Sequence, residues 1–258
     1  MSELALRPPS LIGDVRAMIG RSVRLSARNV DALVTALALP IMLMLLFVYL
    51  FGGAIDTGTA YVTYVVPGVI LLCAGFGSSL TAVAVTEDMK GGIMDRFRSM
   101  DVSGAAVLGG HVVASIARNL MSTVLVLAVA FLIGFRPHAD PLAWLAAVGV
   151  LALFVLALSW FSAAAGLIAR SAEAAGGFTF FVMFLPYPSS AFVPIDTMPS
   201  WLHGFAEHQP FTPVIESMRG LLLGTPVGNA PWLALAWCGG ILAVSVAASG
   251  FLFHRRIR

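Results

Sequence analysis

The chain has 258 residues, of which 59% are hydrophobic and only 11% are charged. An ordinary soluble domain is about 25% charged, so fifteen basic and thirteen acidic side chains are too few to cover a soluble globule of this length. Disorder is excluded as well, because it requires low hydrophobicity and high charge. The net charge of +2 does not favour a nucleic-acid-binding protein. With a mean hydropathy of +0.93, the composition indicates a protein that crosses the membrane several times.

Six stretches almost free of charged residues are long enough to cross a bilayer, which takes about 20 apolar residues per helix. Their apolar cores predict helices at 33–51, 62–86, 115–135, 142–169, 175–193 and 231–253. None of these runs alternates between apolar and polar residues as membrane-spanning strands do. We therefore expect an all-α polytopic membrane protein, with residues 1–258 forming a single transmembrane domain.

The distribution of basic residues predicts the orientation of these helices. Six spans place both termini on one side, and most of the Lys and Arg residues fall on that side, whereas Arg136 and Arg219 lie on the other. Because basic residues concentrate in cytoplasmic segments, both termini are expected in the cytoplasm. No cleavable signal peptide is visible, so the first span is expected to direct insertion.

The first polar segment, residues 10–30, combines apolar residues at helical spacing with arginines on the opposite face. These arginines are Arg16, Arg21, Arg24 and Arg28. The pattern predicts a basic amphipathic helix that lies in the inner membrane interface. Such a helix either anchors the chain to the membrane surface or docks a cytoplasmic partner, and the sequence leaves both interpretations open.

The second polar segment, residues 87–111, is a cytoplasmic loop that is unusually rich in both acids and bases. Its notable residues are Glu87, Asp88, Lys90, Asp95, Arg96, Phe97, Arg98 and Asp101. Two glycines, Gly91 and Gly92, are expected to end the helix that leaves the membrane, and one helical turn would present Phe97 and Met100 on the same face. The segment is either an ordinary solvated loop or a short helix that inserts into another protein.

The last polar segment, residues 194–230, is rich in proline and is expected outside the cell. Pro186 and Pro188 precede it and should break the fifth helix near its outer end, because proline removes a helical hydrogen bond. Non-helical backbone at membrane depth must be buried in protein or face water. We therefore expect short outer re-entrant helices between the fifth and sixth spans.

Motifs for catalysis or for ion coupling are missing from the sequence. The single lysine, Lys90, is not part of a phosphate-binding loop, and the zinc-protease motif H-E-x-x-H is absent. A proton-coupled transporter would place an acid at mid-depth, but the spans contain only Arg118 near the inner surface, which either reaches water or pairs with Glu87 or Asp88. Any transport energy must therefore be delivered by another component, and we expect no metal site and no catalytic residue in this chain.

Two motifs together carry a resemblance to a known family. The first motif comprises Glu87-Asp88, Gly91 or Gly92, Arg96-Phe97-Arg98, Val102-Ser103 and Ala106-Val107-Leu108-Gly109. The second comprises Phe192-Val193-Pro194, Met198-Pro199-Ser200-Trp201-Leu202, Pro210, Thr212-Pro213 and Glu216 to Gly224. They resemble the permease subunits of the ABC type-2 exporters, and especially the daunorubicin/doxorubicin-type drug-resistance permeases and their mycobacterial-type lipid-export relatives. In the first motif, Asp101 and Gly104 replace a proline and an arginine that the family often carries.

The resemblance implies an ATP-driven exporter of an amphipathic drug, lipid or glycolipid in a bacterial plasma membrane. Two copies of a cytoplasmic ATPase subunit would bind ATP and Mg, this chain would bind no cofactor, and a second, identical or paralogous, permease copy would complete the complex. The charged residues of segment 87–111 would couple to the ATPase. The alternatives are a polysaccharide permease of the same fold and a membrane enzyme or scaffold.

The resemblance also implies that the second and fifth helices line the substrate path. Their large apolar residues are Phe76, Phe178, Phe180, Phe181, Met183 and Phe184. They would form a wall that contacts apolar cargo, although each of them could instead pack in the core or face lipid. An outer gate would lie near Pro186, Pro188 and Pro194.

Overall fold

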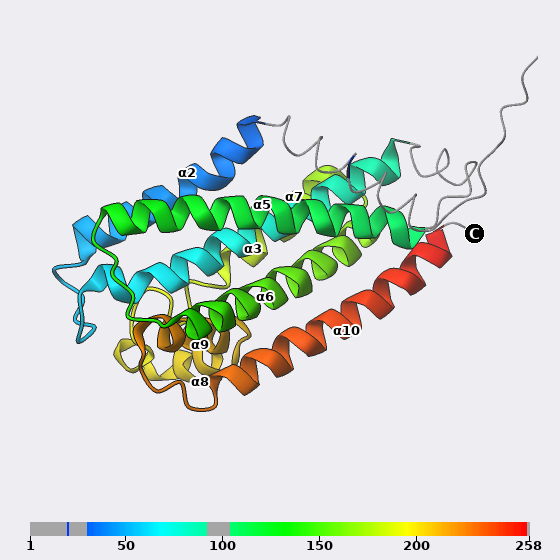
Figure 1. Ribbon diagram of the computed structural model, residues 1–258. Coiled ribbons are helices and arrows are strands. Elements are labelled where there is room, and N and C mark those ends of the chain that lie inside the picture. Colours follow the sequence, from blue (N-terminus) through cyan, green and yellow to red (C-terminus); the bar gives the residue numbers. More distant parts are fainter. Residues whose placement is uncertain (1–19, 21–29, 92–103, 257–258) are drawn as a thin grey trace, which may run out of the picture.

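The structure, a computed structural model, describes residue 20, residues 30–91 and residues 104–256. Its regular elements are α2 (Val30–Leu46), the π-helical η1 (Phe47–Phe51), α3 (Tyr61–Lys90), α5 (Gly104–Leu132), α6 (Pro141–Ile168), α7 (Ala172–Phe184), the 3₁₀-helical η2 (Ile195–Thr197), α8 (Ser200–His208), α9 (Phe211–Leu223) and α10 (Ala230–Arg256) (Figure 1). The described ranges contain no strand, which confirms the all-α prediction for this part of the chain. The predicted amphipathic helix 10–30 lies outside the described residues, apart from Gly20 and Val30.

Four helices in the described ranges are long and apolar enough to cross a membrane. They are Tyr61–Lys90, Ala106–Leu132, Pro141–Ile168 and Ala230–Phe253, and they coincide with the predicted second, third, fourth and sixth spans. Two shorter apolar helices, Ala38–Phe51 and Ala172–Phe184, lie at the positions of the predicted first and fifth spans.

The bounds of two helices differ from the prediction for identifiable reasons. α5 starts at Gly104 instead of residue 115, because Arg118 interrupts the charge-free run on which the prediction was based. α7 ends at Phe184 instead of residue 193. Pro186 follows two residues later, and because it has no backbone N–H it cannot donate the helical hydrogen bond to the carbonyl of Val182.

Local sequence signals fix several helix ends. Asp140 caps α6, since its Oδ1 accepts a hydrogen bond of 2.6 Å from the backbone N–H of Ala143, and Pro141 occupies the first helical position, where its missing N–H does no harm. Ser171 caps α7 in the same way through Ala174, at 3.1 Å. Gly224 ends α9 with a φ of 68°, a left-handed conformation that favours glycine.

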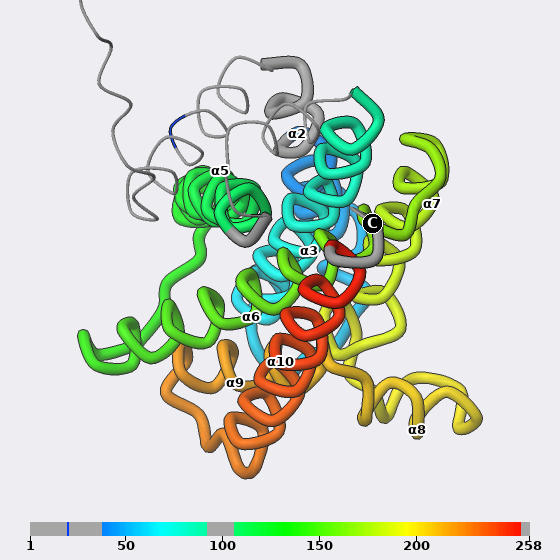
Figure 2. The backbone as a smooth tube through the Cα atoms, turned by 90° about the vertical axis from the view of Figure 1, so that its right-hand side faces the viewer, coloured from blue at the N-terminus to red at the C-terminus, as the bar shows by residue number. Residues whose placement is uncertain are grey.

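Helix α3 is the centre of the bundle. Most of its side chains are buried, and Val65, Val66 and Val69 are fully inaccessible. It packs against α2, α5, α6, α7 and α9. Figure 2 shows α5 and α7 on opposite sides of α3, and α7 otherwise makes only a minor contact with α6. A displacement of α3 would therefore reach every neighbouring helix.

Glycines allow close backbone approach at two contacts of the bundle. A Cβ added to Gly166 of α6 would lie 2.6 Å from the carbonyl oxygen of Ala82 in α3. A Cβ added to Gly68 of α3 would lie 2.7 Å from the backbone of Ala191. Small residues at helix contacts let backbones pack closely, as is common in membrane proteins.

The two ends of the bundle differ in structure (Figure 1). At one end, here called the α9 end, α8 and α9 lie beside the beginning of α3 and the end of α5. At the opposite end, here called the Lys90 end, α3 ends, α5 begins and α10 ends. The candidate functional residues fall into one group at each end and a third group on α7.

Candidate functional site

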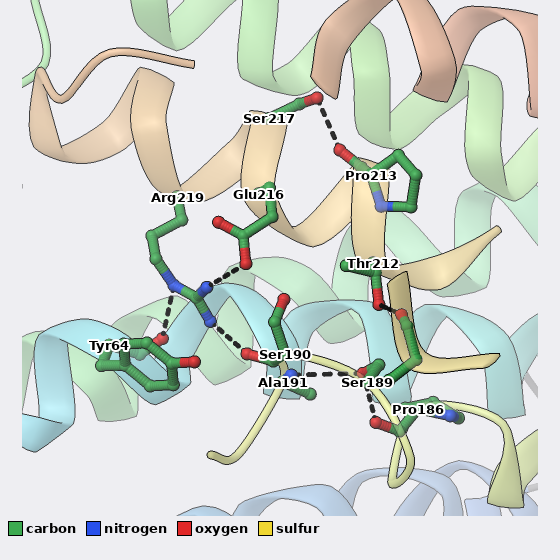
Figure 3. A network of polar contacts seen from close by, with 11 residues as sticks. Tyr64, Pro186, Ser189, Ser190, Ala191, Thr212, Pro213, Glu216, Ser217 and Arg219 are labelled. Carbon is green, nitrogen blue, oxygen red and sulfur yellow. Dashed lines mark hydrogen bonds and ion pairs between the residues drawn. The ribbon is translucent and has the colours of Figure 1, made fainter. Parts of the chain in front are cut away.

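A single buried arginine joins three segments at the α9 end. Arg219 of α9 is only 8% exposed. Its Nε donates a hydrogen bond to the carbonyl oxygen of Tyr64 in α3 at 3.2 Å, and its Nη2 donates to the carbonyl oxygen of Ser190 at 2.5 Å. Its Nη1 donates to Oε1 of Glu216 at 2.8 Å. Figure 3 shows the guanidinium between these three partners. One side chain thus holds α3, α9 and the turn after α7 together.

The environment of Arg219 compensates for the burial of its charge. The guanidinium carbon lies 3.7 Å from the centre of the Tyr64 ring, a cation–π geometry that is favourable for a desolvated arginine. Glu216 supplies the opposite charge from one helical turn earlier, and its side chain is 41% exposed. A buried charge is tolerated when it is paired and hydrogen-bonded, and Arg219 meets both conditions.

The turn 185–192, which follows α7, is held by hydrogen bonds within the turn and from side chains of other segments. Within the turn, the hydroxyl of Ser189 donates to the carbonyl of Pro186 and accepts from the N–H of Ala191 (Figure 3). From outside, Nε2 of Gln209 donates to the carbonyl of Pro188 at 2.9 Å, and the hydroxyl of Tyr61 donates to the carbonyl of Phe192 at 2.8 Å. Non-helical backbone in this position thus has partners for its carbonyl groups.

The three prolines predicted at an outer gate all lie between α7 and α8. Pro186 is buried, whereas Pro188 and Pro194 are half-buried. Pro186 and Pro188 supply carbonyl acceptors within the turn, and Pro194 precedes η2 and accepts a hydrogen bond from the hydroxyl of Thr197 at 2.7 Å. The structure therefore gathers the three prolines in one connection, next to Arg219.

A cavity of about 380 Å³ lies beside Arg219 at this end. Its polar lining comes from Thr57, Thr59, Tyr64, Ser190, Asp196, Glu216, Arg219 and Thr225. The hydroxyl oxygen of Ser190 is buried and has no hydrogen-bond partner among the described residues. The cavity combines two carboxylates, one arginine and several hydroxyl groups, so it is polar and accessible at the surface of the α9 end.

The residues predicted to line a substrate path separate into two groups. Phe180, Phe181 and Phe184 are 60%, 63% and 49% exposed and form what we call the α7 aromatic face. Phe178 packs against Phe161 of α6, with ring centroids 5.4 Å apart. Met183 also packs partly buried against the core, and Phe76 of α3 is half-buried. The structure does not bring all six residues into one wall.

A row of aromatic rings connects the α7 aromatic face to η1. Ring centroids are 4.7 Å apart for Phe180 and Phe184, and 5.6 Å apart for Phe184 and Tyr187. The row continues from Tyr187 to Phe192 at 5.3 Å and from Phe192 to Phe47 at 4.5 Å. In the sequence, Phe192 is only part of a motif and this row is not predicted, because the contact between Phe47 and Phe192 joins residues far apart in the sequence.

At the Lys90 end, the three described residues of the predicted coupling set point in different directions. Glu87 and Lys90 are exposed, whereas Asp88 is buried. Oδ2 of Asp88 lies 3.0 Å from Nε2 of His111 in α5. The remaining predicted coupling residues, Asp95, Arg96, Phe97, Arg98 and Asp101, lie outside the described residues.

A polar seam continues from this pair along the contact between α3 and α5. Arg118 donates through Nε and Nη2 to the carbonyl oxygen of Gly77, at 3.3 and 2.8 Å, so its guanidinium turns towards α3. One residue further, Nδ2 of Asn119 lies 3.2 Å from Oγ of Ser78. Ser115 of α5 is hydrogen-bonded to Ser159 of α6 at 2.8 Å. These contacts fasten three helices to one another at mid-length.

The described residues contain no group of three or more His, Cys, Asp or Glu side chains that could hold a metal ion. The sequence indicates Arg219 as an outer basic residue and as part of a motif, but it does not predict the contacts of its side chain. The spacing of Glu216 and Arg219, three residues apart on a helix, could have predicted their ion pair. The carbonyl partners of Arg219 carry no sequence signal.

The comparisons with known proteins agree with the resemblance seen in the two motifs. Residues 13–223 match the ABC-2 type transporter family. The chain is 29% identical over 226 residues to the daunorubicin resistance ABC transporter permease protein of Streptomyces coeruleorubidus, covering 87% of this chain and 80% of the relative. It is 25% identical over 231 residues to the probable doxorubicin resistance ABC transporter permease protein of Mycobacterium tuberculosis, covering 89% and 84%. The chain therefore belongs to the ABC-2 type transporter family and is a multi-pass membrane permease of an ABC transporter.

Proposed function

We propose that this permease works in an ATP-driven exporter that moves an amphipathic drug, lipid or glycolipid out of the cell. The observation that carries the proposal is the α7 aromatic face, where Phe180, Phe181 and Phe184 are exposed while the opposite face of α7 packs on α3. Aromatic rings supply large apolar contact area, so such a face suits cargo with an extended apolar body. The similarity to daunorubicin and doxorubicin resistance permeases supports the same cargo class.

The proposal includes six membrane crossings, with α2–η1 as the first and α7 together with the turn 185–192 as the fifth. A helix of 13 residues is about 20 Å long at 1.5 Å per residue, whereas the hydrocarbon core is about 30 Å thick. The turn must complete the crossing, and its carbonyl groups must be satisfied inside the protein. The bonds from Tyr61, Gln209 and Arg219 meet that requirement.

The orientation follows from the charge distribution. The Lys90 end faces the cytoplasm of a bacterial cell together with both termini, and the α9 end faces outward. Two copies of a separate ATPase subunit bind ATP and Mg, contact segment 87–111 and hydrolyse the ATP, so this chain has no catalytic activity of its own. A second permease copy completes the membrane part of the complex, and the N-terminal segment lies on the lipid surface.

In the proposed mechanism, ATP binding brings the two ATPase subunits together and moves segment 87–111. Because α3 begins at the α9 end and runs to Lys90, this displacement reaches the turn 185–192 through the contacts of Tyr61 and Tyr64. The region of Pro186, Pro188 and Pro194 then opens as an outer gate, and cargo leaves from the α7 aromatic face.

Transport in proteoliposomes tests the function. The permease is purified with the ABC ATPase that co-purifies with it, and uptake of daunorubicin into inside-out vesicles is measured with and without ATP. We expect ATP-dependent uptake that falls severalfold when Phe180, Phe181 and Phe184 are all changed to alanine. A matched control changes Trp232, Leu233 and Leu235 of α10, which are also exposed apolar residues, and should leave uptake unchanged.

A fluorescent phospholipid serves as the second probe in the same vesicles. If neither daunorubicin nor the phospholipid moves in response to ATP, the exporter of amphipathic cargo is refuted. If the α7 and α10 triple variants reduce uptake equally, the α7 aromatic face has no special role and the path lies elsewhere.

A further inference from the structure

We propose that Asp88 and His111 form a clasp that makes α3 and α5 respond together when segment 87–111 is displaced. The inference rests on the proposed function, because it concerns how the force of an ATPase enters the membrane part. It assigns a role to His111, and it gives Asp88 a partner inside the permease rather than on the ATPase.

The position of the pair on the two helices is the first argument. Asp88 lies in the last turn of α3, and His111 lies in the second turn of α5. The pair therefore joins the two stems from which the rest of segment 87–111 extends. A force applied between these stems would pull on α3 and α5 separately unless something linked them at their base.

The burial of the pair is the second argument. Asp88 and His111 are each 9% exposed, and Oδ2 and Nε2 are 3.0 Å apart. Glu87, the adjacent residue, is exposed. A carboxylate turned into the protein cannot dock on an external partner without leaving its own, whereas Glu87 can. Glu87 thus faces outward, whereas Asp88 faces inward and contacts His111 of α5.

Packing beneath the clasp supports the same function. One turn before Asp88 in α3, Val85 packs in a buried apolar cluster with Leu108 of α5 and Leu167 of α6. Thr86 donates a hydrogen bond of 3.0 Å to the carbonyl of Gly166. The polar seam of Arg118 and Asn119 continues the α3–α5 contact deeper in the bundle. The clasp is the contact closest to the loop in this series and receives its displacement first.

A buried polar contact suits this role because it is directional. An apolar contact is non-directional, so it would let α3 slide on α5. If either side chain shifts, the buried hydrogen bond between Asp88 and His111 is broken, and breaking a buried hydrogen bond is costly. The pair therefore resists sliding.

Hydrogen–deuterium exchange of the intact complex, permease with its co-purified ATPase, tests the clasp. Exchange is compared between the nucleotide-free and the vanadate-trapped states in the segments 82–91 and 105–116. In the wild type, both segments should change on trapping. In Asp88→Ala and His111→Ala, segment 82–91 should still respond, while the response of segment 105–116 should fall by roughly fivefold or more, the lower end of typical coupling between sites.

Two further variants separate coupling from folding. The exchanged pair Asp88→His with His111→Asp should restore the response of segment 105–116, and Asp88→Asn, which keeps a hydrogen-bonding side chain, should give an intermediate response. The matched control is Ser217→Ala, which removes a buried serine hydrogen bond within α9, outside both measured segments, and should leave both responses intact.

Three outcomes contradict the inference. An unchanged response of segment 105–116 in the alanine variants shows that the pair does not link the helices. In a second outcome, the alanine variants no longer co-purify with the ATPase and the exchanged pair does not restore its binding. This result shows that Asp88 contacts the ATPase itself. A wild-type complex in which neither segment responds to trapping refutes the proposed function, and the clasp falls with it.

Discussion

The replacement of Arg219 is the sharpest test of how the α9 end is held together. Arg219→Ala removes three hydrogen bonds and leaves the buried carbonyl oxygens of Tyr64 and Ser190 without this donor. An unsatisfied buried group costs about 1–3 kcal/mol. Glu216 can rehydrate because its side chain is 41% exposed. The carbonyl of Tyr64 keeps its helical hydrogen-bond partner, so the loss comes mainly from Ser190, from the ion pair and from the contact with the Tyr64 ring, and it should total about 2–4 kcal/mol.

Two partial substitutions rank the contributions that the contacts of Arg219 make to stability. Arg219→Lys keeps the charge but offers one point donor in place of a planar fork, so it should lose about half as much stability as alanine. Glu216→Gln keeps a hydrogen-bond acceptor for Arg219 but removes the opposite charge from beside a buried guanidinium, so it should cost about 1 kcal/mol. The expected order of destabilisation is thus alanine, then lysine, then the change at Glu216.

The assay is thermal unfolding of the detergent-purified permease, monitored by the loss of monodisperse protein. For a chain of this size, 1 kcal/mol shifts the midpoint by about 2–4 °C, so Arg219→Ala should lower it by about 10 °C. If Glu216→Gln is as damaging as Arg219→Ala, the ion pair rather than the two carbonyl contacts holds this end. A midpoint of Arg219→Ala within about 2 °C of the wild type would refute the reasoning altogether.

Three further substitutions test local features of the bundle, and each is measured by the same unfolding midpoint. Gly166→Ala should destabilise by about 1–3 kcal/mol, because the new Cβ would lie 2.6 Å from the backbone oxygen of Ala82; an unchanged midpoint would show that α3 and α6 can separate freely. Asp140→Ala should cost about 1 kcal/mol through loss of the α6 cap, and Asp140→Asn should restore most of it, which a mere charge effect would not do. Ser159→Ala should cost about 1 kcal/mol, and a much larger loss would mean that its bond to Ser115 anchors more than two helices.

The sequence predicted the long helices well and the helix ends less well. A run of about 20 apolar residues is dictated by the thickness of the hydrocarbon, so the helices that became α3, α6 and α10 follow from composition alone. The first half of α5 contains polar residues that are buried by packing, such as His111 and Asn119, and an apolar criterion does not recognise them as part of a span. Their burial is decided by α3, which no local pattern reveals.

The candidate site was predictable only where its residues are close in sequence. The Pro186–Pro188 pair marked the end of α7, and Glu216–x–x–Arg219 carried the spacing of an ion pair. Asp88 and His111 are 23 positions apart, and Arg219 meets the backbone of Tyr64 across 155 positions. Such pairs arise from the tertiary arrangement of the helices, and a single sequence contains no signal that selects them.

The peripheral position of α7 has a consequence for how this protein can diversify. Its buried face packs chiefly on α3, whereas Phe180, Phe181 and Phe184 are largely exposed. Substitutions at exposed positions usually change stability by no more than about 0.5 kcal/mol. Selection for a different cargo could therefore rewrite this face with little penalty to folding, while the residues around Arg219 and α3 stay fixed. Related permeases could differ in what they carry and still share one scaffold.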